Sequence, residues 1–438
     1  MSLRHGMTPK MKPVAPKRTV TVSAIDIGTS KIACMIARLR PAPETDVLPR
    51  RSHGIEVIGI GHTRSAGIKG GNIVNLAEAE NAVRQAVSAA EKMAGVQLES
   101  CVVSVSAGRP TSDLYAATVH VSGSSVSDHD IERVLAAGSH HSVRQGRAVL
   151  HSFPIGYAID DTRGVKDPRG MLGRRLGVDM HVMTVDAAAV RNLMLCVERC
   201  HLSVEAMVAT PYVSGLAALT DDEADLGAAV VDIGAGTTTL AVFNNGAFVH
   251  ADGFSLGGRN VTMDLARGLN ARIADAERVK TLHGSVLSGS ADEREMITIA
   301  PADDREPAHT VSRAQLIRII KPRAEEILEM LRDRLMNSPF AAEPRGRIVL
   351  TGGGAQLNGL AELAATVLGR QVRVGRPLGL SGLPEAAKGP AFAVAAGLLV
   401  YPQLAHVEHF EARRPSMLGN AANNNYFMRV GRWLRESF

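Results

Sequence analysis

A short motif that occurs twice constrains the fold of this chain more than any other feature. The stretch TVSAIDIGTSKIACMIARL is an apolar run, a break at residues 28–31 and a second apolar run, a pattern typical of two strands joined by a tight turn. The stretch AAVVDIGAGTTTLAVF repeats this plan, and Asp26 and Asp232 begin the two Asp-Ile-Gly motifs 206 positions apart. Two matching hairpins of this kind predict a duplicated α/β domain.

The residue types at these turns suit a nucleotide and its metal ion. Glycine lets a turn approach a ligand closely and aim successive N–H groups at an anion, and hydroxyl groups add donors for phosphate oxygens. Two facing carboxylates, Asp26 and Asp232, would hold Mg²⁺ largely through water, because Mg²⁺ dehydrates reluctantly and prefers carboxylates together with phosphate oxygens. The candidate nucleotide-binding residues at the turns are Asp26, Gly28, Thr29, Ser30, Lys31, Asp232, Gly234, Gly236, Thr237 and Thr238.

Other phosphate-binding loops do not match these turns. A Walker loop needs GxxxxGK[ST] before a helix, and a dinucleotide-binding fold needs GxGxxG after a strand; the sequence has neither. One Asp-Ile-Gly turn alone is also compatible with a purely structural hairpin. The second copy in the same register favours the binding site.

Two further segments extend this candidate site. RIVLTGGGAQLNGLAELAATVLG predicts a strand, a loop of Gly352, Gly353 and Gly354, and an amphipathic helix; a loop without side chains suits the flat face of a nucleoside. DAERVKTLHG places Glu277 and Lys280 one helical turn apart, able to reach a ribose or base edge, although a surface ion pair explains them equally well. GPAFAVAAGLLVY predicts a helix of small residues that packs closely at a hinge.

The last residues, YFMRVGRWLRESF, form an amphipathic pattern that includes the only Trp of the chain. At about 100° per residue, the apolar side chains fall within roughly 140° and the arginines lie opposite. Such a helix suits the headgroup boundary of an anionic membrane or, alternatively, a protein groove; arginine-rich flanks and the terminal position favour the membrane. The candidate membrane-binding residues are Tyr426, Phe427, Arg429, Val430, Arg432, Trp433, Leu434, Arg435 and Phe438.

Composition excludes several other classes of protein. No apolar run approaches the roughly 20 residues of a membrane-spanning helix. The basic N-terminal stretch lacks an apolar region, so we expect a disordered arm rather than a signal peptide. The four cysteines give no disulfide framework, which suits a reducing compartment. The net charge of +5 comes partly from the two tails, and aromatic residues are not interleaved with basic ones in the body, so nucleic-acid binding is not expected.

The order of two hairpins, a glycine loop and a small-residue helix resembles the actin/Hsp70/hexokinase superfamily. Several longer stretches are more specific: GGNIVNLAEAENAVRQAVSAAEKMAG, HSFPIGYAIDD, FSLGGRNVTMDLARGL and IVLTGGGAQLNGLAEL are similar to the FtsA family of bacterial cell division proteins. The resemblance covers about residues 20–402 and returns in GRWLRESF. The segment SGSADEREMITIAPADDREPAHT departs from the family pattern.

This resemblance implies a duplicated actin-like ATPase fold with an inserted small α/β domain and a C-terminal amphipathic helix. The implied parts are a disordered basic arm (1–18), a first actin-like subdomain (19–99, continuing at 183–226 and 390–402), an inserted division-type subdomain (100–182), a second actin-like subdomain (227–260 and 346–389), an upper subdomain (261–345), a flexible linker (403–424) and a membrane-targeting helix (425–438).

The resemblance also implies a function. An FtsA-like chain would bind Mg-ATP, form membrane-bound filaments and tether the FtsZ ring to the inner face of the cytoplasmic membrane at the division site. The C-terminal peptide of FtsZ would bind residues 261–345, with Arg323 and Glu326 as candidate contacts, although an exposed charged helix face explains these two residues as well. Other division proteins would bind the inserted domain.

The sequence identifies no residue that activates water, so we expect slow hydrolysis at most, with ATP acting mainly as a conformational ligand. Two relatives of the same fold remain as alternatives. A pilus-assembly ATP-binding protein would lack the terminal amphipathic helix. A sugar kinase would need a substrate-binding aspartate, for which the sequence offers no convincing candidate.

Overall fold

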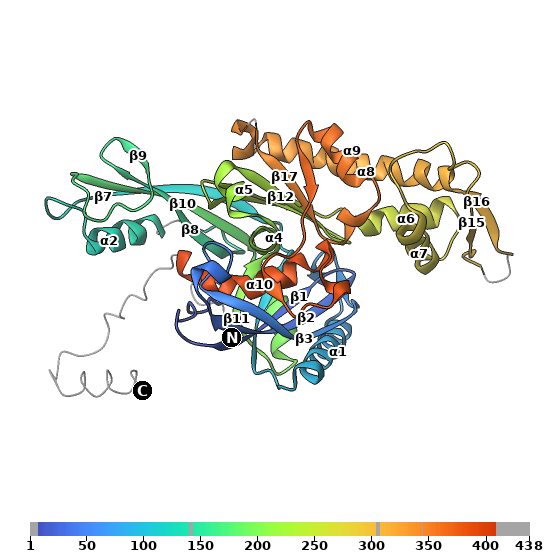
Figure 1. Ribbon diagram of the computed structural model, residues 1–438, viewed down its shortest axis with the longest axis horizontal. Coiled ribbons are helices and arrows are strands. Elements are labelled where there is room, and N and C mark those ends of the chain that lie inside the picture. The colour runs from blue at the N-terminus through green and yellow to red at the C-terminus, as the bar shows by residue number, and fades with distance from the viewer. Residues whose placement is uncertain (1–7, 140–142, 304–306, 344, 409–438) are drawn as a thin grey trace.

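Two sheets of the same topology form the centre of the molecule (Figure 1). The computed structural model describes residues 8–139, 143–303, 307–343 and 345–408. In each sheet an antiparallel meander of three strands is followed by two strands parallel to its first strand. The first sheet contains β1 (Val20–Ile27), β2 (Lys31–Pro41), β3 (His53–Arg64), β6 (Ser100–Val105) and β11 (Ser203–Ala209). The second contains β12 (Ala228–Ile233), β13 (Thr238–Asn244), β14 (Ala247–Phe254), β17 (Arg347–Thr351) and β18 (Val372–Val374). This shared topology confirms the predicted duplication.

Helices cover the first sheet on both faces. Helix α1 (Leu76–Ala94) begins at Asn75, whose side chain accepts from the Glu78 N–H, and ends at Gly95, where φ is +67°. It buries a stripe of alanines and valines and lies so close to β3 that a Cβ on Gly61 would be 2.1 Å from the Ala86 carbonyl oxygen. Helix α3 (Ala187–Glu198) packs against α1 and β11, whereas α4 (Thr210–Ala218) and α5 (Asp221–Leu226) pack against β12 and β13 of the second sheet. Two short strands, β4 (Ile68–Lys69) and β5 (Asn72–Ile73), form a separate ribbon.

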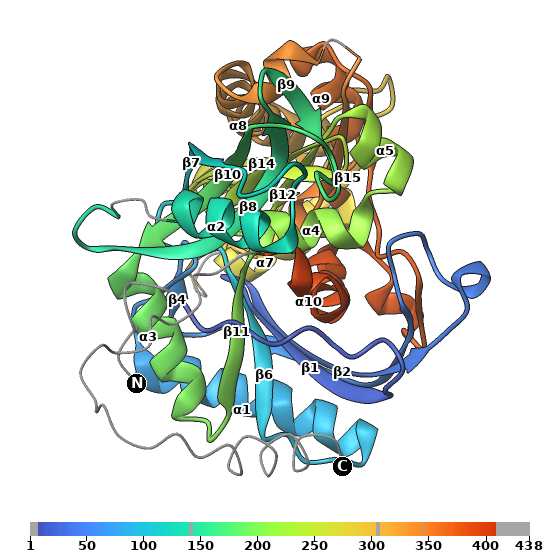
Figure 2. The ribbon, with the colours of Figure 1, turned by 90° about the vertical axis from the view of Figure 1, so that its left-hand side faces the viewer.

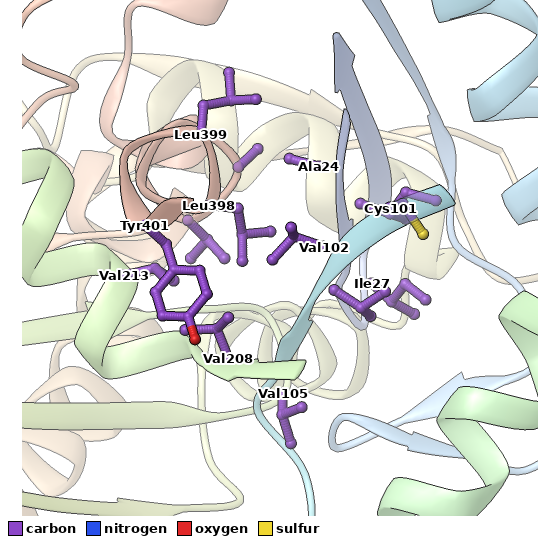
Figure 3. Packing of buried hydrophobic residues seen from close by; sticks show 14 of the residues in the cluster. Ala24, Ile27, Cys101, Val102, Val105, Val208, Val213, Leu398, Leu399 and Tyr401 are labelled. Carbon is purple, nitrogen blue, oxygen red and sulfur yellow. The ribbon is translucent and has the colours of Figure 1, made fainter. Parts of the chain in front are cut away.

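Helix α10 (Ala393–Leu404) lies between the two sheets and packs on α4 (Figure 2). A Cβ on Gly397 would be 1.9 Å from the Val213 carbonyl oxygen, so the two helices could not approach so closely with a larger residue there. Leu398 and Tyr401 of α10 lie close to Val213 of α4 in the core (Figure 3). The stretch 390–407 is apolar and long enough to cross a membrane, but 78% of it is buried inside the protein, so it is core packing.

A separate four-stranded sheet projects at one end of the molecule, on the left in Figure 1. Its strands run in the order β7-β10-β8-β9, and α2 (Asp128–Ser139) packs on it. The strands are β7 (Thr111–His120), β8 (Arg147–Ile159), β9 (Thr162–Val165) and β10 (Arg175–Asp186). The predicted start of this insertion, residue 100, is too early, because β6 pairs with β1 and β11 in the first sheet. An apolar strand has the same sequence pattern in either sheet, so the pattern of β6 does not show whether it belongs to the first sheet or to the insertion.

The opposite end of the molecule is a helical layer with one hairpin (Figure 1). It comprises α6 (Gly258–Gly268), α7 (Ile273–His283), α8 (Arg313–Met336) and the hairpin β15 (Met296–Ile299) with β16 (His309–Ser312); α9 (Leu360–Leu368) packs against α8. After β18 the chain returns to the first half, since β19 (Leu380–Ser381) pairs with β3. The predicted second subdomain, 346–389, therefore ends before residue 380.

The predicted disorder of the arm 1–18 and the predicted flexibility of the linker 403–424 are wrong for residues 8–18 and 403–408, which the structure describes. Residues 8–18 pack along the first half: the Thr8 N–H donates to the Val149 carbonyl and the Val14 N–H to the Pro402 carbonyl. Apolar side chains of this arm cover the core, which a local charge pattern does not reveal. Of the predicted linker, residues 403–408 continue from α10 and end in the buried Glu408. Residues 409–424 and the predicted membrane helix 425–438 lie outside the described residues.

Candidate functional site

A cleft of about 1100 Å³ brings together the glycine-rich turns of both halves. The predicted site residues that line it are Asp26, Gly28, Thr29, Ser30, Lys31, Asp232, Gly234, Thr237, Glu277, Lys280, Gly352, Gly353 and Gly354. Two predicted residues, Gly236 and Thr238, are not in its wall. The wall therefore combines segments from β1 to α10 that are distant in sequence.

The two Asp-Ile-Gly turns have the same hydrogen-bonded form. The Gly28 N–H donates to the Lys31 carbonyl at 3.0 Å, and the Gly234 N–H donates to the Thr237 carbonyl at 2.9 Å. A Cβ would lie 2.9 Å from the accepting oxygen at Gly28 and 3.0 Å from it at Gly234, so both positions favour glycine for the same reason. The duplication thus extends to the atoms of the turns.

The hydroxyl groups at the turns differ in their freedom to bind a ligand. Thr29 Oγ1 accepts from the Gly71 N–H at 3.1 Å and still has its own proton to donate into the cleft. Thr238 is fully buried, and its hydroxyl donates to the Leu256 carbonyl at 2.9 Å. Thr238 therefore braces the second hairpin instead of facing the cleft, because alternate residues of a strand point to opposite faces.

The two aspartates occupy equivalent environments. Asp26 Oδ1 accepts from the Ser104 hydroxyl at 2.8 Å, and Asp232 Oδ2 accepts from the Ser214 hydroxyl at 3.3 Å. Burial raises the pKa of both carboxyls. The negative charge of Asp26 adds to this effect at Asp232, whose pKa rises to about 7. The carboxyl groups of Asp26 and Asp232 therefore repel each other when both are ionised.

Lys31 supplies a positive charge beside this pair. Its pKa is lowered by burial, and the charges of Asp26 and Asp232 oppose that shift. Its ammonium group donates to the Ala391 carbonyl and lies 3.3 Å from the centroid of the Phe392 ring. Lys31 thus joins the first turn to the segment that leads into α10.

The donor set fits a magnesium ion that is shared with a phosphate. Carboxylate oxygens are the ligands Mg²⁺ prefers, and a divalent cation would relieve the repulsion that raises the pKa of Asp232. Among the described residues no group of three or more His, Cys, Asp or Glu side chains could hold a metal on its own. The two carboxylates would therefore need water and phosphate oxygens to complete the coordination.

The three glycines after β17 meet different requirements. Gly352 has φ +83°, and a Cβ there would lie 2.6 Å from the Ile233 carbonyl oxygen. A Cβ on Gly354 would lie 2.5 Å from Ile233 Cγ2. Gly353 is different: its Cβ would meet only Ala391 Cβ, at 3.9 Å, and the residue lines the cleft. Gly352 and Gly354 let the loop lie against β12, whereas Gly353 leaves open space for a ligand.

Glu277 and Lys280 form an ion pair in the cleft wall. Lys280 Nζ lies 2.7 Å from Glu277 Oε2 and also donates to the Thr262 hydroxyl at 2.8 Å and the Gly258 carbonyl at 3.1 Å. The side chain of Glu277 is 51% exposed, while that of Lys280 is 15% exposed. Glu277 Oε2 also accepts from the Thr262 hydroxyl. Lys280 and Thr262 therefore hold Oε2 at the α7–α6 contact, and Oε1 is the freer oxygen atom of Glu277.

Sequence reasoning missed three hydroxyl residues of the site. Ser104 and Ser214 bind the two aspartates, and Thr210, the first residue of α4, lines the cleft. Thr210 Oγ1 is buried without a hydrogen-bond partner among the described residues, which leaves it available to a bound molecule. No motif marks these positions, because strand pairing and helix placement bring them to the cleft.

The two predicted partner contacts lie elsewhere, on α8. Arg323 donates to both Asp264 on α6, at 2.6 Å from Nε, and Glu326 on its own helix. Its side chain is 26% exposed. The pair therefore lies at the surface of the helical layer but already links α8 to α6.

The paired sheets, with a cleft where their turns meet, define the class of actin-like α/β proteins. A chain of the PilM–PilN type IV pilus biogenesis complex has a similar structure, with a TM-score of 0.60 and 17% identity over 88% of this chain and 99% of that one. MreB5 of Spiroplasma citri bound to ADP has a TM-score of 0.51 and 13% identity over 88% and 97%. At these identities the likeness shows the fold alone.

Sequence comparison identifies the family within this class. The model "Cell division protein FtsA" matches residues 229–397, and "SHS2 domain inserted in FTSA" matches residues 108–184, in agreement with the separate sheet. The cell division protein FtsA of Rhizobium meliloti (strain 1021) is 54% identical over 98% of this chain and 98% of its own length. That of Escherichia coli (strain K12) is 32% identical over 95% and 98%. The chain belongs to the FtsA family of cell division proteins.

Proposed function

We propose that this FtsA-family chain binds Mg-ATP in the cleft and tethers the FtsZ ring to the cytoplasmic face of the membrane at the division site. The observation that carries the nucleotide assignment is the pair of equivalent turns, Gly28–Lys31 and Gly234–Thr237, each next to an aspartate that lines the same cleft. Membership of the FtsA family supports the role in cell division.

Each part of the cleft suits a different part of the nucleotide. The backbone N–H groups of the turns and the Thr29 hydroxyl are donors for phosphate oxygens. Asp26 and Asp232 would hold Mg²⁺ through water. The open space at Gly353 suits the nucleoside, and Oε1 of the half-exposed Glu277 would accept from hydroxyl or amino groups of the ribose or base. The structural likeness to MreB5, which was solved with ADP, supports this placement.

In this proposal ATP acts mainly as a conformational ligand. The cleft wall takes segments from both sheets, so a nucleotide that touches both turns favours the closed arrangement of the two halves. None of the described cleft residues is assigned as the group that activates water, so hydrolysis is expected to be slow.

The partner assignments follow from the family resemblance and the sequence. Residues 425–438 would bind anionic lipid as an amphipathic helix, and self-association into filaments would multiply these weak anchors. The C-terminal peptide of FtsZ would bind the helical layer of residues 261–345, close to Arg323 and Glu326. The inserted sheet would recruit other division proteins.

The test of the nucleotide site is Gly353→Asp in the full-length chain. A carboxylate at this position would enter the open space and repel the phosphates, so the affinity for labelled Mg-ATP should fall by at least about tenfold, roughly 1.4 kcal/mol. Gly156→Asp is a matched control, since Gly156 on β8 has nothing within 4 Å of its Cβ and lies outside the cleft. Undiminished affinity of Gly353→Asp would refute the site.

A further inference from the structure

A second pocket, of about 140 Å³, shares no residue with the nucleotide cleft. It lies where α4, β8, β14 and the end of α10 meet, and its floor is aromatic: Phe153, Tyr212, Phe243 and Phe248. The ring centroids of Tyr212 and Phe248 are 4.9 Å apart, and those of Phe153 and Tyr212 are 5.0 Å apart. The floor is therefore a packed, rigid aromatic surface.

The mouth of this pocket has a different character from its floor. Val407 forms part of the wall and is 41% exposed, and Arg50 at the edge is also exposed. Arg51 also lines the pocket, and the edge continues into α5, whose acidic residues are largely paired: Asp221 and Asp225 with Arg50, and Glu223 with Arg347 and Arg373. An apolar, aromatic interior behind a rim of paired charges suits one aromatic group.

The size of the pocket limits what can enter. An engineered cavity of about 150 Å³ holds one benzene molecule, so this pocket accommodates one aromatic ring and not a whole helix. The occupant must therefore present a single ring at the end of a segment that covers the mouth. This requirement favours a peptide with spaced aromatic residues.

The chain itself provides such a segment close to the pocket. Leu404 and Val407 line the pocket, and the described chain ends one residue later, at Glu408. Residues 426–438 contain four aromatic residues and three arginines. The 17 residues between 408 and 426 can span up to about 55–60 Å at roughly 3.3–3.6 Å per residue, so length does not prevent their return to the pocket.

We propose that the pocket holds an aromatic side chain of the chain's own residues 426–438 when no membrane is present. The apolar face of this segment is the one that enters the membrane in the proposed function, on which this inference rests. Pocket and membrane therefore compete, and the protein away from the membrane keeps its anchor covered.

The single tryptophan makes the proposal directly measurable, because all tryptophan fluorescence of the full-length protein comes from Trp433. In lipid-free buffer the wild-type emission should be blue-shifted and protected from acrylamide. Val407→Asp places a charge in the pocket wall and should abolish this protection. Val96→Asp is the matched control, since Val96 is 39% exposed and does not line the pocket.

A second variant fills the pocket without adding a charge beside Glu408. Ala247 is partly exposed and lines the pocket, so Ala247→Phe should occupy the space that the tail needs. Both pocket variants should bind anionic vesicles at least about twofold more tightly than wild type, since apparent affinity scales with the fraction of free tail. Val96→Asp should behave as wild type in both measurements.

Each result separates this inference from the proposed function. Equal quenching of Trp433 in wild type, Val407→Asp and Ala247→Phe would overturn the docking, whereas vesicle binding by all three would leave the tether intact. Protection of Trp433 without any vesicle binding would support docking and remove the tether. Protection that disappears on dilution would assign the occupant to a second copy and overturn docking within one chain.

Discussion

A Cβ at Gly236 would lie 2.8 Å from both Cγ2 and Oγ1 of Thr29, so the tips of the two Asp-Ile-Gly hairpins touch. Gly236 does not line the cleft, and its importance lies in this contact. Thr29 in turn accepts from the Gly71 N–H, which ties the first turn to the loop before α1. The distance between the two halves at the end of the cleft formed by these turns is therefore set by a glycine opposite a threonine.

Gly236→Ala should push the hairpin tips apart and weaken binding of Mg-ATP by at least about tenfold, roughly 1.4 kcal/mol. Isothermal titration would measure the affinity. Thr29→Ala removes both atoms that clash, so the double variant Thr29→Ala/Gly236→Ala should bind more tightly than the sum of the single effects allows. Additive losses in this cycle would show that the contact does not control the cleft.

Asp232→Asn should stabilise the nucleotide-free protein in a pH-dependent way. The pKa of Asp232 is raised from 3.8 to about 7 in the folded state, so the folded protein binds more protons than the unfolded chain between these values. Wild-type stability therefore falls as pH rises through this range, and asparagine removes that loss. The difference in melting temperature between variant and wild type should grow from about pH 4 to about pH 7 and then level off. A difference that is constant with pH would contradict the buried, repelled carboxyl. Mg-ATP should stabilise wild type more than the variant.

Lys10→Met should destabilise the protein, although the sequence predicts a disordered arm at this position. Lys10 Nζ lies 2.7 Å from Glu408 Oε2, and Glu408 also accepts from Tyr401 and from His151. Burial would raise the pKa of Glu408, but the charges of His151 and Lys10 lower it to about 2. Loss of Lys10 leaves this charge poorly compensated, at a cost of about 3 kcal/mol.

Urea unfolding at pH 7 would measure this cost, with Lys12→Met as the control for loss of a lysine two residues away. The depressed pKa of Glu408 stabilises the fold above about pH 4.5, and this contribution is lost as pH falls toward 2. The difference in the free energy of unfolding between wild type and Lys10→Met should therefore decrease as the pH falls from about 4.5 toward 2. Equal unfolding midpoints at pH 7 would mean that the arm does not hold the end of the described chain.

The parts of the fold that sequence could predict are those set by local chemistry. The Asp-Ile-Gly hairpins follow from alternating apolar runs around a glycine turn, and Glu277 and Lys280 follow from helical spacing. Ser104 could not be found in this way, because only the pairing of β6 with β1 brings it to Asp26. The order of the N-terminal arm could not be predicted for a similar reason, since Lys10 binds Glu408, which is 398 residues away in the sequence. Distant contacts, not local patterns, decide such positions.

Arg323→Glu should weaken binding of the FtsZ C-terminal peptide while leaving Mg-ATP affinity unchanged. Reversal breaks the ion pairs of Arg323 and places a third carboxylate beside Asp264 and Glu326, so this surface would repel an acidic peptide group. Fluorescence anisotropy with a labelled peptide would measure the affinity, and a melting curve would check that the α8–α6 contact survives. Arg318→Glu is the control, because Arg318 is exposed on the same helix at a different angle. Equal peptide affinity in both variants would remove Arg323 from the interface.

Attachment to the membrane should depend on both faces of the terminal segment. Trp433→Glu places a charge within the apolar arc, where immersion would leave it poorly hydrated, so this variant should no longer sediment with anionic vesicles. Reversal of Arg432 and Arg435 should weaken binding to anionic vesicles more than to neutral ones, and added salt should reduce wild-type binding in the same way.

A helix that docks only in a protein groove would also be damaged by Trp433→Glu, so the isolated peptide 425–438 decides between the two. Fourteen residues are too few for a stable helix in water, but insertion of an apolar face compensates the cost of ordering them. Circular dichroism should therefore show a disordered peptide in buffer and a helical one with anionic vesicles. A peptide that stays disordered with lipid, together with a full-length protein that does not sediment with vesicles even with ATP and FtsZ, would exclude the membrane tether.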